Sequence, residues 1–173
     1  MEKQTISMPM VALRGMAVLP EMVVHFDVSR SRSIEAVQKA MQNKEQKIFL
    51  VSQRELHIEE PNQEDLFTVG TVATIKQVAK MQRNLLRVLI TGEERAKLVR
   101  VNAMEPYLEA EIQVMEDYND YEVENINECP EAKGLKEIFF EYTAKSGKLS
   151  KDVIAQIADT NELKSLVNRV AAN

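Results

Sequence analysis

The side chains best suited to metal binding and nucleophilic catalysis are few and far apart in this chain. Its 173 residues include one cysteine, Cys129, and two histidines, His25 and His57. His25 falls on the polar side of an expected strand and His57 in an expected loop, whereas a metal site needs several such ligands at one point. The sequence contains no G-x-S-x-G segment that could present a nucleophilic serine. We therefore predict no metal centre and no covalent catalysis by these residues alone.

The glycines and carboxylates lead to the same conclusion. The five glycines are isolated, so they form neither a phosphate-binding G-x-x-x-x-G-K loop nor a dinucleotide-binding fingerprint. The 27 acidic side chains are typical of a solvated surface, which we favour over a catalytic pair of carboxylates. We expect no cofactor bound to these residues, and we do not expect the chain to be an enzyme by itself.

Charge is distributed unevenly. Residues 1–115 carry 15 basic and 15 acidic side chains, whereas residues 116–173 carry 7 basic and 12 acidic ones. Within the second part, EDYNDYEVENINECPEA (116–132) holds seven carboxylates and no lysine or arginine. We interpret this segment as an extended, self-repelling linker, with an acidic docking tract as the alternative. Because the chain has no basic stripe, nucleic acid is not expected as a partner.

The cysteine content and the hydropathy favour a cytoplasmic protein. A single cysteine cannot form an intrachain disulfide, so nothing indicates an oxidising compartment. The sequence shows no secretory leader and no apolar run approaching about 20 residues. We therefore expect no membrane partner.

Before the acidic segment the apolar residues recur mostly at every second position, which is typical of β-strands. The stretch 8–28 is rich in strand-like apolar residues, and a helix with a serine cap is expected over 31–43. Residues 53–68 are expected to be a loop with one helical turn near 64–66. Short turns between alternating strands favour a small barrel or a highly curved sheet. The strands are expected at 22–28, 47–52 (a central strand), 69–79 (with Gly70 as a candidate bulge), 85–91 after a turn at 81–84, 96–101 and 107–115.

After the acidic segment the apolar repeat changes to 3.6 residues, which is typical of helices. A first helix is expected to begin at Pro130 and to stop at Gly147. Ser150 is expected to cap a second helix, and Asp159 with Glu162 to form a capping box for a third. The first helix should bury Ala132, Leu135, Ile138, Phe139 and Tyr142.

The third helix is expected to carry a wide apolar stripe. Three short helices offer little surface to cover it, so we expect a truncated helical bundle. The predicted fold class is α+β, with a β-rich lobe over 1–116, an acidic linker over 117–131 and the start of an α-helical lobe over 132–173. The stripe consists of Leu163, Leu166, Val167, Val170 and Ala171.

An ordered series of short motifs along the chain resembles the N-terminal part of bacterial Lon, the ATP-dependent protease family. The stretches 49–55, 64–78, 85–99 and 139–167 match later motifs of that family. The chain departs from the family pattern at Leu19, which replaces a phenylalanine, and at Glu21, which replaces a turn glycine. Other departures are Ala12, His25, Pro130 and Gly134. The opening motifs are matched by Pro9, Leu13, Arg14, Pro20, Met22, Arg30, Ser33 and Ile34.

The resemblance implies a β-rich lobe similar to the PUA-like fold, followed by the first part of an α-helical lobe. It also implies a role in protein quality control: capture of unfolded, damaged or degron-bearing proteins and assembly of a homo-hexamer. The family's ATPase module, which uses ATP and Mg, and its Ser-Lys protease module lie outside these residues. No catalytic residue is therefore carried over. Two alternatives are a free-standing adaptor of the same fold and an RNA-binding module, the latter suggested by the PUA-like fold alone.

A receptor for unfolded proteins should offer adaptable apolar contacts, because its ligands share exposed apolar segments rather than one sequence. Methionine suits this task, and six copies in a ring would strengthen weak binding. Ordinary core packing is the alternative for each candidate residue, and addition of a substrate segment to a strand edge is a second binding mode. The candidates, at the turn after the first strand and at a hairpin tip, are Met16, Leu19, Pro20, Met22, Met81 and Leu85.

Overall fold

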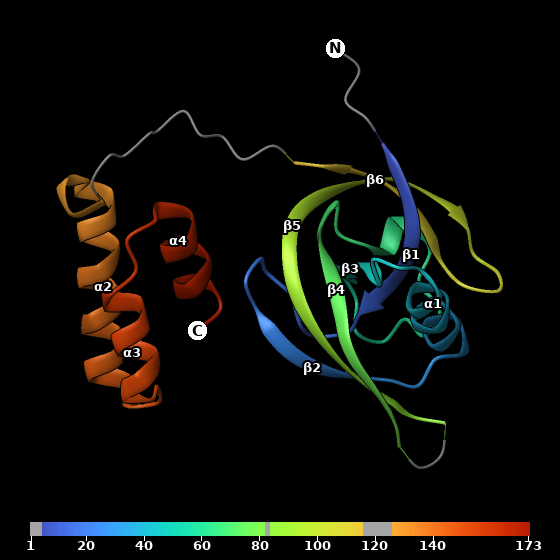
Figure 1. The fold of residues 1–173 in the computed structure, drawn as a ribbon, viewed down its shortest axis with the longest axis horizontal. Helices are drawn as coiled ribbons and strands as arrows, with labels where there is room; N and C mark the ends of the chain where they lie inside the picture. The colour runs from blue at the N-terminus through green and yellow to red at the C-terminus, as the bar shows by residue number, and fades with distance from the viewer. Residues whose placement is uncertain (1–4, 82–83, 116–125) are drawn as a thin grey trace. The chain divides into compact units, whose positions relative to one another are not determined.

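The computed structural model describes residues 5–81, 84–115 and 126–173 (Figure 1). The chain divides into two compact units, residues 1–116 and 117–173, and each is described by itself. The first unit contains β1 (Ile6–Leu13), β2 (Val23–Val28), α1 (Ser31–Gln42), β3 (Lys47–Ser52), the short helical turn η1 (Gln63–Asp65), β4 (Val69–Lys80), β5 (Leu86–Ala103) and β6 (Glu109–Val114). The second contains the helical turn η2 (Ile126–Glu128), α2 (Pro130–Ser146), α3 (Lys151–Ala158) and α4 (Leu163–Ala171). The predicted α+β class is confirmed.

The strands of the first unit form a strongly curved sheet that closes on itself (Figure 1). The strand order is β2-β5-β4-β3-β1-β6, and an additional β5–β6 pairing completes the ring. Only the β1–β3 pairing is parallel among the pairs of described strands. The first half of β5 pairs with β2 and its second half pairs with β6. The predicted curved sheet or barrel is therefore present.

Strand β5 differs from the sequence prediction, because the strands expected at 85–91 and 96–101 are one continuous strand of 18 residues. Gly92, which lies between the two expected strands, is part of it. A β-carbon at residue 92 would overlap the backbone of Leu19, so the glycine permits a close approach of two segments rather than a turn. The pairing register shifts opposite this point, between Val72 and Ala73 of β4.

The predicted bulge at Gly70 is also wrong. Gly70 pairs in regular register with Ala96, and the irregularities of β4 lie between Val72 and Ala73 and beyond Ile75. A β-carbon on Gly70 would overlap the carbonyl oxygen of Leu50 and the ring of Phe49. Residue 70 is therefore glycine because the backbone and the Phe49 ring of the neighbouring strand β3 leave no room for a side chain.

The core of the first unit lies on both faces of β3, as expected for a central strand. Ile48 and Leu50 pack into one cluster with the buried face of α1, whereas Phe49 and Val51 pack into the other. Helix α1 begins one residue earlier than its serines suggest: its N-cap is Arg30, whose side chain makes no capping bond, so the predicted serine cap is wrong. The expected helical turn in the 53–68 loop is present as η1.

The helices of the second unit follow the local signals closely. α2 begins at Pro130, and Gly147 ends it with a φ of 60°. The hydroxyl of Ser150 accepts a hydrogen bond from the Val153 amide at 3.4 Å and caps α3. Gly134 lies within α2 and does not shorten it. The buried core of this unit consists of Ile126, Ala132, Phe139, Ile157 and Leu166.

Three expectations for this unit need correction. Ile138 and Tyr142 are exposed, because the buried face of α2 runs through Phe139 and Thr143 instead. The predicted capping box is absent: Asp159 ends α3, and Glu162 is the N-cap of α4 without a side-chain bond to the backbone. Val167 and Ala171 of the predicted stripe are also exposed.

The expected acidic linker lies mostly outside the described residues. Its described end is ordered, because Ile126–Glu128 forms η2 and α2 begins at Pro130, before residue 132. None of the helices in the described ranges combines the length and the apolar character needed to cross a membrane.

Candidate substrate-binding surfaces

The first predicted site region is the turn that joins β1 to β2. The Met22 amide donates to the Leu19 carbonyl oxygen at 3.2 Å, which closes a tight turn with Pro20 at its second position. Glu21 has a φ of 67°, the left-handed conformation that usually requires glycine. Two hydrogen bonds hold the turn on β5: the Glu21 amide donates to the Gly92 carbonyl at 2.9 Å, and the Gly92 amide donates to the Met22 carbonyl at 2.8 Å.

The predicted residues of this turn differ in accessibility. Pro20 is buried, whereas Met16, Leu19 and Met22 are half-buried, and Met16 packs against the core beneath α1. The most exposed apolar side chain here is Val23, with 67% of its surface accessible. Sequence reasoning did not select Val23, although its place on the polar side of the alternating strand 22–28 was a usable signal. We call Leu19, Met22 and Val23 the turn surface.

The second predicted site region is the tip of the β4–β5 hairpin, where Met81 and Leu85 follow and precede the two strands. The Met81 amide donates to the Leu85 carbonyl at 2.7 Å, and the Met81 side chain is 43% exposed. A cavity of about 320 Å³ lies between this end of the hairpin and α1, and Ile34, Met81 and Leu85 line its apolar side. Glu35 and Lys80 line it as well. We call Ile34, Met81 and Leu85 the hairpin groove; part of the turn expected at 81–84 lies outside the described residues.

The two regions do not form one surface. In the β2–β5 pairing Val23, which belongs to the turn surface, lies opposite Thr91, whereas Val28 lies opposite Leu86, next to the hairpin groove. Five residue steps along β2 separate Val23 from Val28, which corresponds to roughly 16–17 Å. The pairing register therefore divides the six predicted residues between two ends of β2.

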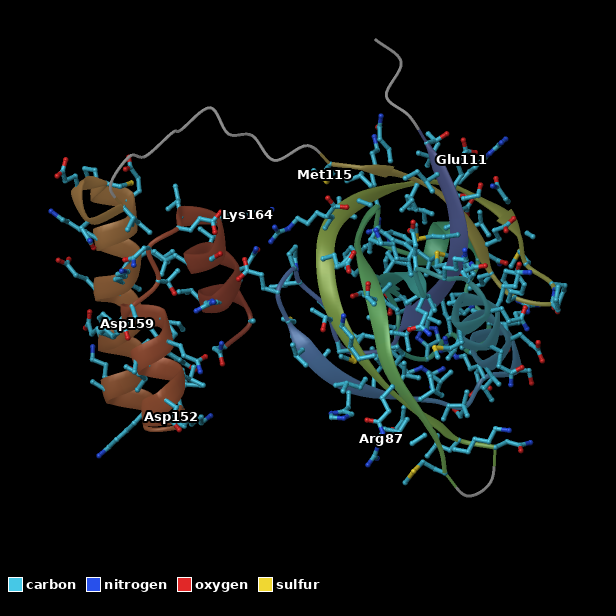
Figure 2. The ribbon with its side chains drawn as sticks, in the orientation of Figure 1. Arg87, Glu111, Met115, Asp152, Asp159 and Lys164 are labelled. Carbon is cyan, nitrogen blue, oxygen red and sulfur yellow. The ribbon has the colours of Figure 1, made fainter. Side chains whose placement is uncertain are left out.

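A charged pair lies on β2 and β5, between the turn surface and the hairpin groove. Asp27 and Arg87 lie directly opposite each other in β2 and β5, and the Arg87 guanidinium donates to both carboxylate oxygens at 2.8 and 2.9 Å. The hydrogen bonds from Arg87, assisted by its charge, hold the pKa of Asp27 below its usual value. Figure 2 shows Arg87 at the hairpin end of the first unit and Met115 at the opposite end.

Residues that could hold a metal do not gather within the described ranges. No group of three or more His, Cys, Asp or Glu side chains there has the geometry to bind an ion. His25 and His57 are both exposed, and Cys129 donates a hydrogen bond to Glu131 at 3.2 Å. The surfaces described above are suited to binding apolar side chains.

A comparison with protein families decides which family this fold represents. Residues 7–173 match the family model described as "ATP-dependent protease La (LON) substrate-binding domain". The chain belongs to this family. The resemblance inferred from the motifs is thereby confirmed, and so is the assignment to the N-terminal part of Lon-type proteases.

Curated Lon proteases match almost the whole chain. The Lon protease of Lachnoclostridium phytofermentans is 41% identical over 99% of this chain, and Lon protease 1 of Bacillus subtilis is 36% identical over 96%. In both cases the match covers 21% of the relative. The chain thus spans about a fifth of the length of the curated relatives that it matches.

Two solved structures share the fold. The N-terminal domain of Lon protease from the Mycobacterium avium complex has a TM-score of 0.70 at 18% identity, and the match covers 94% of this chain and 80% of that one. A Lon N-terminal domain protein from Xanthomonas campestris has a TM-score of 0.59 at 15% identity, over 96% and 98% of the two chains. At these identities the likeness supports the fold alone.

Proposed function

We propose that this chain captures unfolded or damaged polypeptides for a Lon-type ATP-dependent protease in the cytoplasm. The single observation that carries the proposal is the match of residues 7–173 to a substrate-binding domain family. The exposed methionine of the hairpin groove supports it, because a flexible thioether side chain adapts to many apolar partners. Hydrolysis of ATP and cleavage of peptide bonds belong, in this proposal, to other parts of the full-length protein.

The hairpin groove is the better candidate for first contact. Met81 is exposed beside a cavity of about 320 Å³, and the neighbouring Ile34 and Leu85 extend the apolar lining. In the turn surface, by contrast, only Val23 is largely exposed. A cavity next to a flexible apolar side chain allows a substrate side chain to be enclosed, which removes more apolar area from water than contact with a flat face.

The proposal includes assembly of a homo-hexamer. One groove of this size would bind an apolar segment weakly, and six copies held in a ring would raise the effective concentration for a chain that touches several of them. Weak individual contacts also allow release, which a receptor that passes substrates onward requires.

The test is a binding titration with one polypeptide in two states. Fluorescently labelled α-lactalbumin, reduced and carboxamidomethylated so that it stays unfolded, is titrated with the chain and followed by anisotropy. We expect saturable binding of the unfolded form and no binding of the native form. Equal binding of both forms, or binding of neither, would contradict the proposal.

A further inference from the structure

A second cavity, of about 310 Å³, opens where β1 and β2 end and α1 begins. Leu13, Val28 and Ser33 line it together with two cations, Arg14 and Arg30. β1 pairs with β3 and β6, whereas β2 pairs with β5. Among the described strands, β1 and β2 therefore share no backbone hydrogen bonds that would close this opening. Arg14 comes from one stretch of the opening motifs, and Arg30 and Ser33 come from a later one, 16 residues on at its start; the fold brings the two stretches together.

The two arginines meet at a single carbonyl group. Arg14 Nη2 and Arg30 Nη2 donate to the Ile58 oxygen at 3.3 and 3.2 Å, and Gln53 Nε2 donates to the same oxygen at 2.9 Å. Arg30 Nη2 also donates to Gln53 Oε1 at 2.8 Å. Within the part of the chain that the structure describes, Nε and Nη1 of both arginines have no acceptor, and no carboxylate lies within ion-pair distance of either guanidinium.

Two neighbouring cations without an ion-paired anion are electrostatically unfavourable. The pKa of Arg30 lies below its ordinary value, chiefly because the side chain is partly buried and then because of the charge of Arg14. The charges of Glu60 and Glu59 act in the opposite direction, but Glu60 forms its ion pair with Arg32 at 3.2 Å. An anion bound between Arg14 and Arg30 would relieve their repulsion.

The start of α1 adds further donors to the same cavity. Ser33 is only 6% exposed, and it lies in the first turn of α1 and lines this cavity. The first turn of this 12-residue helix holds no acidic residue, and its N-cap supplies no side-chain acceptor. The amides of such a turn and the dipole of the helix favour an oxyanion.

Asp27 is the acidic residue that also lines this cavity, and it does not neutralise the arginines. Both of its carboxylate oxygens accept hydrogen bonds from Arg87, on the neighbouring strand. The lining of the cavity therefore combines two arginines, a buried serine and the start of a helix with an apolar wall.

We propose that this cavity is an oxyanion site that binds a carboxylate of a captured polypeptide through Arg14, Arg30 and Ser33. The proposal rests on the proposed function, because a protein substrate is the source of the carboxylate. A C-terminal carboxylate and an Asp or Glu side chain share this chemistry, and the planar fork of arginine matches either.

The experiment uses three labelled probes made from one apolar hexapeptide: a free C-terminal carboxylate, a C-terminal amide, and the amide with one internal glutamate. Anisotropy titrations measure the Kd of each probe for the chain and for its Arg14→Gln and Ser33→Ala variants. Arg14 is exposed and makes a single hydrogen bond in the described structure, so its replacement preserves the fold. Arg100→Gln is the matched control, because it removes the same charge from an exposed arginine that pairs with Glu111 elsewhere in the unit.

We expect at least one carboxylate probe to bind about tenfold more tightly than the plain amide. Arg14→Gln and Ser33→Ala should each reduce this advantage, and Arg100→Gln should leave it unchanged. The probe that carries the advantage identifies the source of the carboxylate. Equal binding of all three probes, or equal losses in Arg14→Gln and Arg100→Gln, would overturn the proposal.

Two further measurements separate this proposal from the proposed function. If inorganic phosphate binds the chain and no carboxylate probe does, the site does not bind a polypeptide carboxylate and the proposal is overturned. Unfolded α-lactalbumin could also bind the chain and its Arg14→Gln variant equally, while the carboxylate probes show no advantage over the amide. This result would overturn the oxyanion site but not the proposed capture of unfolded proteins. Absence of any α-lactalbumin binding would overturn the capture function itself.

Discussion

The carbonyl oxygen of Leu19 lies so close to the α-carbon of Gly92 that a β-carbon on residue 92 would overlap it. Two hydrogen bonds between the same segments, Glu21 amide to Gly92 carbonyl and Gly92 amide to Met22 carbonyl, keep them in contact. The turn after β1 is therefore hydrogen-bonded to the middle of β5, and residue 92 has no room for a side chain.

Gly92→Ala should destabilise the first unit by about 2–3 kcal/mol, because the turn or the strand must move to admit a methyl group. Urea unfolding followed by circular dichroism, with amide hydrogen exchange at Val88 and Ile90 to report on β5, measures the loss. Gly134→Ala is the control: a β-carbon there meets no atom within 4 Å, and it should stabilise α2 by about 0.5–1 kcal/mol. An unchanged unfolding midpoint for Gly92→Ala would contradict the close approach.

Glu21→Gly should stabilise the first unit by about 0.5–1 kcal/mol, because residue 21 adopts a φ of 67° that a β-carbon disfavours. The same urea titration measures the gain. Glu21→Ala removes the carboxylate but keeps the β-carbon, so it should bring no gain. If the alanine and glycine variants proved equally stable, the strain at this turn would not be the cause.

Met81→Ser should weaken binding of unfolded α-lactalbumin about fivefold, because a half-exposed apolar side chain of the hairpin groove is lost. Met115→Ser, which replaces a methionine of similar exposure (41% against 43%) at the opposite end of the unit, should leave the Kd unchanged. Leu19→Ser tests the turn surface in the same assay. A loss in Leu19→Ser without a loss in Met81→Ser would move the binding site to the turn.

Arg87→Gln should raise the pKa of Asp27 toward its ordinary value of 3.8, since Arg87 is the main cause of the lowered pKa. A lowered native pKa means that the ionised carboxylate stabilises the fold above pH 3.8, and that this stabilisation is lost as the pH falls through the native pKa. Carbon NMR of the Asp27 carboxyl group against pH measures the shift. An unchanged titration midpoint in Arg87→Gln would contradict the assignment.

Much of the architecture was predictable because buried faces of strands and helices require apolar residues at regular spacings, which can be recognised in short stretches of sequence. Strand β3 matches its predicted bounds, and the alternation in 22–28 identified the buried Phe26 and Val28. The signals at Pro130, Gly147 and Ser150 placed the ends of helices correctly, since each acts through its own backbone or its nearest neighbours.

Predictions that depended on distant partners were less successful. Gly70 was interpreted as a bulge, and two separate strands were expected on either side of Gly92, yet both residues are glycine because another segment lies against them. Glu162 was expected to complete a capping box, but it is the N-cap of α4 and its side chain makes no capping bond. For the candidate site, methionine content pointed to Met81, but burial of Pro20 and exposure of Val23 depend on packing that composition does not record.

By itself, the sequence determined the α+β class, the change from strands to helices, the family and the lack of recognisable catalytic motifs, because periodicity, short-range signals and motif order are local properties of the chain. Only the tertiary structure decided that the turn and hairpin residues form two separate surfaces, and that Arg14, Arg30 and Ser33 line one cavity. The physical reason is that strand register and chain closure determine which distant residues meet, and neither is recorded in a local pattern.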